Sequence, residues 1–458
     1  MLGAALILLA LAGPALLASA RPALRAELRR GERYLRLNGA PAFLLGRNPT
    51  ELSVGAFESR FREAEAAGER LMRLHLMHGI PPGRGPGEID EEWARRWESV
   101  FDAAARRGIA VIPVFTVWAQ WNDGSGGELW HVWNDNPYNA ARGGPARSPA
   151  DVLGDTPCRR AWLRWLGNLV RRWRGRTNIA AWEPISELDL VTGSSPAAGA
   201  GFIAAAAATI RAADTGRRPI TVSLSGIHDW PELFRSPAVD IVQAHPYAID
   251  APWAGRLADE IIAVTRERLA RYGKPVLLGE CGLDWRPPPG TLTQAERAPV
   301  GIRQAIWAAA VSGAISGRML WWEDGYDRYE RGDASARCGD VAAPVARFAR
   351  EVAWRDLRPA AALCPPEIRG AALAGAVSAI GWFRDALCDP PTWPERPLTG
   401  LSVTLSINGS AAAWRVRFYD ALTGEPTGET LLRSAKGRLT IPLPPFRGSI
   451  ALQATRAR

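Results

Sequence analysis

Short apolar runs alternate with amphipathic stretches from residue 34 to residue 352. In the amphipathic stretches apolar residues recur every three or four positions, the period of a helix, as at Trp162, Trp165, Leu169 and Trp173. The apolar runs between them are short, as buried strands are. We expect strands at residues 42–45, 70–76, 109–115, 179–182, 220–224, 241–244, 275–278 and 319–322. We expect the main helices at residues 57–68, 91–107, 159–174, 197–213, 254–272, 292–311 and 341–352.

This alternation favours parallel strands, because parallel neighbours need a crossover connection that a helix supplies. Eight strand-then-helix units follow one another, and eight is the number that closes a (β/α)8 barrel. An open, doubly wound sheet is the rival fold. No G-x-G-x-x-G motif follows any expected strand, which argues against a dinucleotide-binding sheet. Asn38-Gly39 predicts a hairpin turn just before the first barrel strand.

Beyond Pro359 the pattern changes to that of short β-strands. The turn pairs Asn408-Gly409, Thr423-Gly424 and Lys436-Gly437 separate some of these runs. The expected strand-forming runs are residues 370–383, 401–407, 413–419, 429–432, 438–443 and 449–454. Several short strands at this spacing predict a small antiparallel β-sandwich. We therefore expect a barrel at residues 21–359 and a β-sandwich domain at residues 360–458.

The amino-terminal segment has the features of an export signal. Leu2–Leu17 is an apolar run, and Ala18-Ser19-Ala20 follows it as an A-x-A cleavage site. The run is shorter than the roughly 20 apolar residues of a membrane-spanning helix. We expect residues 1–20 to be a signal peptide and the protein to be secreted or periplasmic; an uncleaved amino-terminal membrane anchor is the alternative. No other segment is expected to be long and apolar enough to span a membrane.

The charge of the chain does not indicate a nucleic-acid-binding protein. The formal net charge is +9, and nearly all cations are arginines, since Lys274 and Lys436 are the only lysines. Nucleic-acid-binding proteins usually carry a clustered basic stripe, whereas these arginines are scattered among Asp and Glu. We expect mostly solvated helix faces, although an acidic polysaccharide would also suit this charge.

The five cysteines have no metal-ligand spacing such as C-x-x-C. An exported chain can form disulfides, and Cys364 with Cys388 is the best candidate pair. His75 and His78 lack a third ligand at a sensible spacing for a metal site. The sequence therefore predicts neither a metal centre nor an organic cofactor.

Polar side chains follow several expected strands, at the end of the barrel where active sites lie. Glu183 and Glu187 follow the fourth strand, and Glu280 follows the seventh. Glycoside hydrolysis needs such a carboxylate pair, one to protonate the leaving oxygen and one to attack the anomeric carbon or activate water. The other polar or aromatic residues near strand ends are Arg47, Asn48, Arg73, His75, Trp118, Trp121, Trp130, Trp133, His245, Tyr247, Trp321, Trp322 and Glu323.

Five motifs in this order resemble clan A glycoside hydrolases, most closely the cellulase-like family 5 and its relatives. Residues 181–187, A-W-E-P-I-S-E, are similar to the W-E-x-x-N-E segment of the clan, and residues 274–280, K-P-V-L-L-G-E, to its K-P-x-x-x-x-E nucleophile strand. Residues 245–247, H-P-Y, resemble the H-x-Y after strand six, and residues 321–322 the aromatic platform after strand eight. Arg73 resembles the strand-two arginine that hydrogen-bonds the nucleophile. The resemblance covers residues 34–357.

The resemblance implies Glu187 as general acid/base and Glu280 as nucleophile of a retaining β-glycosidase. Ser186 departs from it, because the clan usually has an Asn there that donates to the sugar 2-hydroxyl. We expect the charge of Glu280 to raise the pKa of Glu187, and Arg73 and Tyr247 to favour ionised Glu280. The residues expected to bind substrate or support the pair are Arg73, Ser186, His245, Tyr247, Trp118, Trp121, Trp285, Trp321 and Trp322.

Alternatives remain at several positions. Glu183 reads better as the partner of a nearby Arg than as a catalytic group. The Trp118–Trp133 group is either a sugar platform or loop packing, and Trp382, Trp393 and Trp414 fit the core of the sandwich. For the whole chain, the expected partner is an oligo- or polysaccharide. The rival functions are a carbohydrate-binding protein on a barrel that has lost catalysis and a glycosidase of exopolysaccharide assembly.

Overall fold

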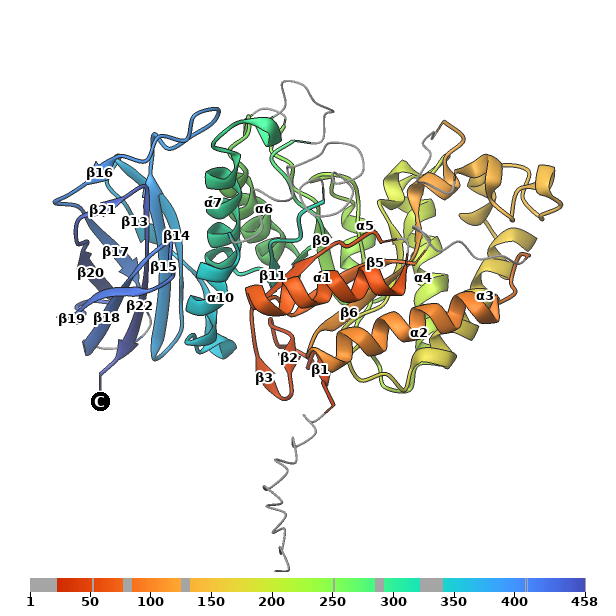
Figure 1. Ribbon diagram of the computed structural model, residues 1–458, viewed down its shortest axis with the longest axis horizontal. Coiled ribbons are helices and arrows are strands. Elements are labelled where there is room, and N and C mark those ends of the chain that lie inside the picture. Colours follow the sequence, from red (N-terminus) through yellow and green to blue (C-terminus); the bar gives the residue numbers. More distant parts are fainter. Residues whose placement is uncertain are drawn as a thin grey trace, which may run out of the picture.

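Parallel strands form the centre of the larger domain in this computed structural model of the chain (Figure 1). The structure describes residues 23–457 apart from 52, 77–84, 125–131, 250–251, 285–291, 322–340, 408 and 410. One sheet has the order β11-β4-β5-β6-β7 and a second the order β10-β9-β8. The parallel bridges Trp182–Ile220 and Cys281–Leu320 join their edges. The two sheets therefore close into a ring, which confirms the (β/α)8 barrel.

The barrel strands carry the buried side chains on which the site is built. Their bounds are β4 (Leu44–Arg47), β5 (Leu71–His75), β6 (Ala110–Val117), β7 (Glu183–Ser186), β8 (Thr221–Val222), β9 (Ile241–Ala244), β10 (Val276–Leu278) and β11 (Ser316–Gly317). Every residue of these strands is buried, as expected when helices cover a parallel sheet.

The outer helices lie close to the predicted ranges. They are α1 (Val54–Ala67), α2 (Glu91–Arg106), α3 (Pro157–Trp173), α4 (Pro196–Ala213), α5 (Pro231–Arg235), α6 (Leu257–Tyr272), α7 (Ala298–Ser312) and α10 (Ala343–Arg350). Side-chain oxygens of Ser53, Asp90, Thr156 and Ser195 accept from the first turns of four of them, which satisfies backbone N–H groups that have no partner within the helix.

Two barrel strands lie away from the predicted runs, for the same reason. The fourth strand is Glu183–Ser186 rather than residues 179–182, and the eighth is Ser316–Gly317 rather than residues 319–322. Both contain polar or small residues where the prediction looked for apolar ones. Glu183 and Ser186 are buried against Arg73, and a Cβ on Gly317 would meet the ring of Phe43 at 2.7 Å. These strands are buried through polar partners and close packing, so they lack the apolar run by which the prediction placed strands.

The carboxy-terminal part is an antiparallel sandwich, as predicted. Its six-stranded sheet contains β12 (Arg358–Ala360), β14 (Ile368–Ala374), β15 (Ser378–Asp385), β22 (Ser449–Arg456), β18 (Ala413–Asp420) and β19 (Pro426–Arg433) in that order. Facing it are β13 (Ala362–Leu363), β17 (Ser402–Ser406) and β20 (Arg438–Pro442), and β16 (Pro397–Leu398) pairs with β21 (Phe446–Arg447). The predicted single run 370–383 is a hairpin of two strands, β14 and β15.

The sandwich packs on the barrel through its larger sheet (Figure 1). Trp414 lies in the sandwich core, as expected, but Trp382 and Trp393 belong to the apolar cluster that also contains Trp307 of α7. Nε1 of Trp307 donates to the carbonyl of Ala421 at 2.9 Å. The prediction that Trp382 and Trp393 form the sandwich core is therefore wrong. Trp382 lies on the second buried face of the sheet, and Trp393, in the segment between β15 and β16, packs against Gly301 of α7.

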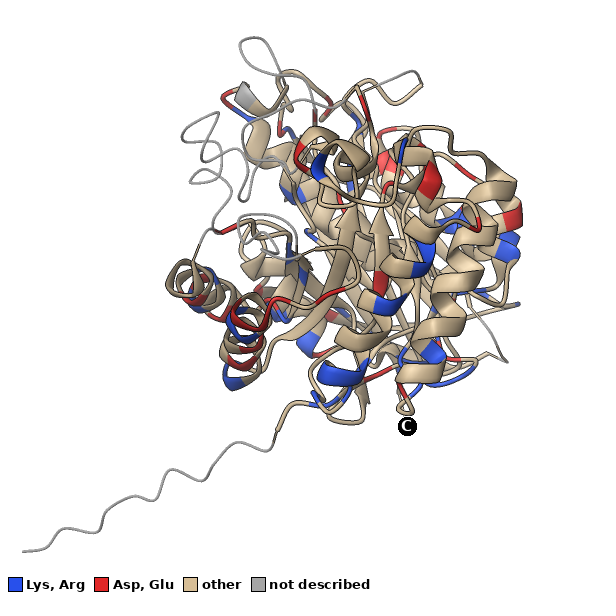
Figure 2. Cartoon of the chain, turned by 90° about the vertical axis from the view of Figure 1, so that its right-hand side faces the viewer, with Lys and Arg blue, Asp and Glu red and all other residues tan. Residues whose placement is uncertain are grey.

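The charges and cysteines of the described residues complete this picture. Arg and acidic residues are interspersed over the outer helices (Figure 2), as on solvated helix faces. Cys364 and Cys388 are not joined in a disulfide, and the Cys388 sulfur lies 3.0 Å from Nε2 of Gln304; the expected pair is wrong. Cys338 and the predicted signal segment, residues 1–20, lie outside the described residues.

One helix was missed as a membrane candidate. Among the described residues, α4 is the helix long and apolar enough to cross a membrane by length and composition. Its residues Phe202, Ile203, Ala206 and Ile210 lie in the core cluster of the barrel, as in a core helix of a globular domain.

Candidate active site

Arg73 is the centre of a buried network at the mouth of the barrel. It comes from β5, and its side chain is fully buried. Its Nε and Nη2 donate to both carboxylate oxygens of Glu183 at 2.7 Å, and Nη1 donates to Oε1 of Glu280 at 2.7 Å and to Oδ1 of Asn48 at 3.2 Å. A guanidinium suits this position because its planar fork serves two carboxylates at once. Arg73 therefore lies against Glu280 as the resemblance implied.

Ser186 lies in the same network, with its hydroxyl oxygen accepting from Nη2 of Arg73 at 2.7 Å. The side chain is buried. In this structure the Ser186 hydroxyl is therefore a hydrogen-bond acceptor for Arg73. Glu183 takes the fork of Arg73 in two parallel bonds, which agrees with its reading as a structural ion-pair partner.

Glu280 follows β10 and is held from two sides. Oε1 accepts from Arg73, and Oε2 accepts from the hydroxyl of Tyr247 at 2.9 Å. Burial raises the pKa of the Glu280 carboxyl, and the positive charge of Arg73 opposes that rise. Burial also raises the pKa of Tyr247 well above 10, so its hydroxyl keeps its proton and donates. Arg73 favours the ionised form of Glu280, as expected, but burial of the carboxyl opposes ionisation.

Glu187 lies just beyond β7, in an unusual backbone conformation. Its φ is 55°, in the left-handed region, which costs free energy for a residue with a Cβ. Ser223, directly after β8, holds Glu187 in this conformation. The N–H of Glu187 donates to Oγ of Ser223 at 2.9 Å, and the N–H of Leu188 donates to the Ser223 carbonyl at 3.1 Å. Strained positions that the surroundings over-determine are typical of functional sites.

The carboxyl of Glu187 is set up to hold a proton. Its Oε1 lies 2.9 Å from Nδ1 of His245. Burial and the negative charge of Asp189 raise the pKa of Glu187 to about 8. The sequence predicted a raised pKa for Glu187; burial and Asp189 are its leading causes, and the charge interaction between Glu187 and Glu280 raises the pKa of Glu280. Asp189 itself accepts from Ser225 and lies 2.7 Å from Nδ1 of His228, which ties the loops after β7 and β8 together.

The two carboxyl groups are close enough for one reaction centre. Ligand-type atoms of Glu187, His245 and Glu280 all lie within 4.8 Å of one another. Such spacing also occurs at cation sites, but here these atoms face Arg73, Tyr247 and each other in hydrogen bonds. One carboxyl next to an imidazole and another next to a guanidinium is an arrangement for proton transfer and nucleophilic attack.

The aromatic residues divide between the mouth and the core. Trp321 is buried with its ring edge-on to His75, 4.9 Å between centroids, and Nε2 of His75 lies 3.8 Å from Oε1 of Glu280. Trp118 is half-buried in the 3₁₀ turn Trp118–Trp121, directly after β6. The expected Trp285 and Trp322 lie outside the described residues, as do His78, Trp130 and Glu323.

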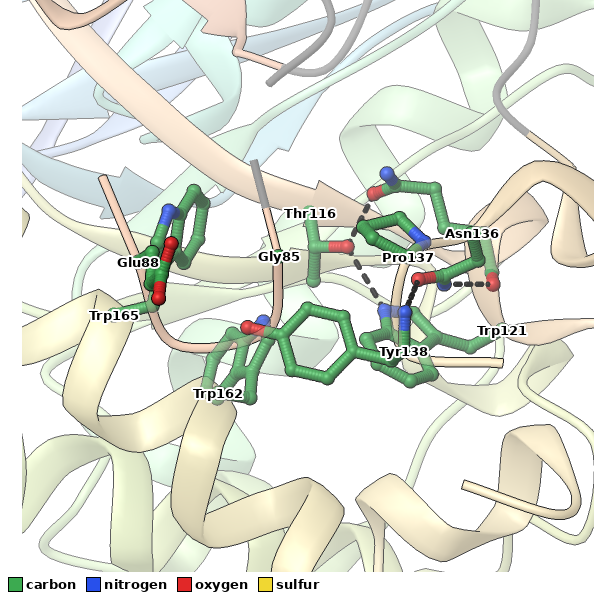
Figure 3. Close-up of a pocket in the computed structure, with 10 residues that line it drawn as sticks. Gly85, Glu88, Thr116, Trp121, Asn136, Pro137, Tyr138, Trp162 and Trp165 are labelled. Carbon is green, nitrogen blue, oxygen red and sulfur yellow. Dashed lines mark hydrogen bonds between the residues drawn. The ribbon is translucent and has the colours of Figure 1, made fainter. Parts of the chain in front are cut away.

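Trp121 is packed inside the loop after β6. It is buried, its Nε1 donates to Oγ1 of Thr116 at 2.9 Å, and it packs against Trp133 and Tyr138. With Trp162 it lines a cavity of about 20 Å³ (Figure 3), which is near the size of one water and too small for a sugar ring. The burial of Trp121 and Trp133 supports the loop-packing alternative in this structure.

Sequence reasoning left several members of the network without a role. Asn48 and His75 were noted at strand ends but not assigned to the site, and Ser223, Asp189 and Gln243 were not singled out. Gln243 carried a signal, because it is the polar member of an otherwise apolar strand, I-V-Q-A. A buried amide within a barrel strand requires hydrogen-bond partners, which only the folded chain identifies.

Solved structures similar to this chain include glycoside hydrolases of families 5 and 30, at low sequence identity. A glycoside hydrolase family 5 protein from Bacteroides vulgatus ATCC 8482 superposes with a TM-score of 0.66 and 14% identity, covering 94% of this chain and 93% of that one. The endo-β-1,4-mannanase from Thermotoga petrophila gives 0.53 and 15%, covering 87% and 98%.

A family 30 subfamily 8 xylanase from Clostridium acetobutylicum gives a TM-score of 0.52 and 13% identity, covering 94% of this chain and 100% of that one. No protein-family model and no curated protein matches the sequence. The chain thus has the fold of these clan A glycoside hydrolases over most of its length.

Proposed function

We propose that the protein is a retaining glycoside hydrolase that cleaves a β-linked glycan, with Glu280 as nucleophile and Glu187 as general acid/base. The observation that carries the proposal is the pair of carboxyl groups with atoms within 4.8 Å and opposite surroundings. Retaining enzymes hold their carboxyls about 5–5.5 Å apart, whereas inverting enzymes need roughly 6.5–9.5 Å to admit a water. Mannanase and xylanase structures among those with this fold support a polysaccharide substrate.

In the first step Glu280 attacks the anomeric carbon while the glycosidic C–O bond breaks and Glu187 gives its proton to the leaving oxygen. Arg73 and Tyr247 hold the Glu280 oxygens by hydrogen bonds at 2.7 and 2.9 Å, which orients the carboxylate for attack. In the second step Glu187, now ionised, takes a proton from water, and the water oxygen displaces Glu280 from the sugar.

The test is a comparison of Glu280→Gln and Glu187→Ala with the parent on β-glucans, mannans, xylans and uronic-acid polymers. Glu280→Gln should abolish turnover on every substrate. Glu187→Ala should spare aryl glycosides with good leaving groups, and added azide should restore activity and yield a β-glycosyl azide. Glu395→Gln is the matched control, because Glu395 pairs with Arg297 and Arg303 away from the mouth.

Two outcomes would contradict the proposal. An α-configured first product by NMR from a β-linked substrate would mean inversion and would remove Glu280 as nucleophile. Sugar binding by the parent without turnover on any substrate would favour the carbohydrate-binding alternative. The observation behind that alternative is Ser186, which replaces the usual Asn and bonds Arg73.

We also propose that the protein is exported and that its mature chain begins at Arg21. The A-x-A motif at residues 18–20 supports this. Amino-terminal sequencing of protein recovered outside the cytoplasm should read from Arg21, whereas an intact Met1 in a membrane fraction would support the amino-terminal anchor.

A further inference from the structure

A chain of buried hydrogen bonds leads from the backbone of β9 to Glu187. Nδ1 of His245 lies 2.9 Å from Oε1 of Glu187, and its Nε2 lies 3.3 Å from Oε1 of Gln243. Nε2 of Gln243 donates to Oγ1 of Thr221 at 3.2 Å, and the Thr221 hydroxyl donates to the carbonyl of Ile241 at 3.0 Å. Thr221, Gln243 and His245 are all buried.

The packing around Gln243 leaves little room for its amide to move. Gln243 and His245 are two residues apart at the end of β9, so their side chains point to the same side. On the neighbouring strand, Gly279 follows β10 and precedes Glu280, and a Cβ at Gly279 would lie 1.5 Å from Oε1 of Gln243. The absence of a side chain at Gly279 is what admits the Gln243 amide beside His245.

The backbone carbonyl gives this chain its direction. A carbonyl only accepts, so the single hydroxyl proton of Thr221 goes to Ile241, and Thr221 accepts from the amide N–H of Gln243. The amide oxygen of Gln243 then faces Nε2 of His245 and needs a proton from it. A neutral His245 is thereby held with its proton on Nε2 and a lone pair on Nδ1.

We propose that Thr221, Gln243 and His245 keep the proton on Glu187, with Gln243 as the positioning residue that fixes the His245 tautomer. This inference rests on the proposed function in naming Glu187 as the general acid. A lone pair on Nδ1 accepts from a protonated carboxyl but repels a carboxylate. The same lone pair assists the second step, because an ionised Glu187 facing it takes the proton from water more readily. In the first step Glu187 gives its proton to the leaving oxygen against this stabilisation.

The charges around Glu187 fit this assignment. Burial lowers the pKa of His245 to about 4 and raises that of Glu187 to about 8, so between these pH values the imidazole is neutral and the carboxyl protonated. Asp189 and Glu183 add negative charge near Glu187, while Arg73 and His228 oppose them. Glu280 lies 3.6 Å from Nδ1 of His245, and Tyr247 donates its proton to Glu280.

The decisive variant is Gln243→Leu, which removes the acceptor for the Nε2–H of His245. The tautomer with the proton on Nδ1 then becomes favoured, and Nδ1 donates to an ionised Glu187. The alkaline limb of kcat/KM should move to lower pH by about one unit, with a larger loss on substrates with poor leaving groups, which need acid catalysis. Gln304→Leu is the matched control, since Gln304 is also buried but bonds Cys388 at the junction.

Nitrogen-15 NMR of the histidine rings gives a readout that does not depend on activity. In the parent at neutral pH, His245 should show the Nε2–H tautomer, assigned by comparison with a His245→Asn sample. In Gln243→Leu it should show Nδ1–H. If the parent turns over no glycan but shows these tautomers, the inference about Thr221, Gln243 and His245 holds and the proposed function fails.

A second variant guards against a misfolded first one. Gln243→Glu keeps the size of the side chain, and its introduced carboxylate favours a doubly protonated His245 that donates from Nδ1. The alkaline limb should again move to lower pH. A parent with the proton on Nδ1, or two folded variants with unchanged tautomer and unchanged pH profile, would overturn the proposal.

Discussion

The barrel mouth and the junction with the sandwich each contain a buried arginine, Arg73 and Arg384. The two arginines make similar contacts but differ in the balance of charge around them. Each is at most 1% exposed and bonds two carboxylates. Arg384 of β15 pairs with Asp259 of α6 at 3.0 Å and Asp389 at 2.8 Å. Arg369 bonds the same two aspartates, so two cations face two anions at the junction.

The mouth lacks this balance. Arg73 is one cation among Glu183, Glu187 and Glu280, with the two contacted carboxylates almost completely buried. A buried network with more carboxylates than cations favours a bound proton, because an uncompensated buried charge is costly. The balanced junction joins the two domains, whereas the unbalanced mouth holds the proton that the proposed acid catalysis would use.

The largest effect is expected from Arg73→Met. It leaves two buried carboxylates without their cation, which costs about 3–5 kcal/mol when a buried pair is broken. It also frees Glu280, so turnover should be lost even where the protein still folds at low temperature. Urea unfolding and kcat/KM measure the two effects; a stable and active variant would contradict the central role of Arg73.

Arg384→Met sharpens the comparison, because it removes a buried arginine with the same number of carboxylate partners. Asp259 and Asp389 are 20% and 26% exposed and keep Arg369, so we expect a loss of about 1–3 kcal/mol. The kcat/KM of the folded variant should match the parent. A loss of turnover at temperatures where the variant is folded would mean that the junction acts on the mouth.

Glu187→Gln tests the stored proton through stability. Burial and Asp189 raise the pKa of Glu187 to about 8, above the ordinary value of 4.5. As pH rises between these values, the unfolded chain releases this proton while the folded chain keeps it, so the parent loses stability. Glutamine has no such proton, and the gain in Tm of the variant over the parent should be larger at pH 8 than at pH 5. An equal gain at both pH values would contradict the raised pKa.

The smallest effect is expected from Ser186→Ala. The variant removes one acceptor of Arg73, which keeps its bonds to Glu183, Glu280 and Asn48. Loss of one such bond should cost about 0.5–1.5 kcal/mol, with a loss of turnover of a few fold, seen by thermal unfolding and kcat/KM. A loss of turnover as large as that of Arg73→Met would show that Ser186 contacts the sugar directly.

Much of this fold could be predicted because its signals are local. The helices have apolar periodicity and side-chain caps within a few residues, as at Ser53 and Asp90, and the number of strand–helix units is countable along the chain. The fourth and eighth barrel strands were misplaced because Glu183, Ser186 and Gly317 are buried by partners distant in sequence. The hairpin of β14 and β15 was read as one run for a similar reason, since both strands are apolar on two buried faces.

Sequence alone determined the order of the elements and the residue types at the strand ends, among them Arg73, Glu187, His245, Tyr247 and Glu280. These residue types can be read along the chain because the chemistry of a carboxyl, imidazole, phenol or guanidinium group belongs to the single residue. Tertiary structure alone decided which of them meet: it turned Ser186 to Arg73, buried Trp121, and added Asn48, Ser223 and Gln243. The physical reason is that the raised pKa of Glu187 comes from burial and from the charge of Asp189, and burial exists only after strands distant in sequence have closed into a barrel.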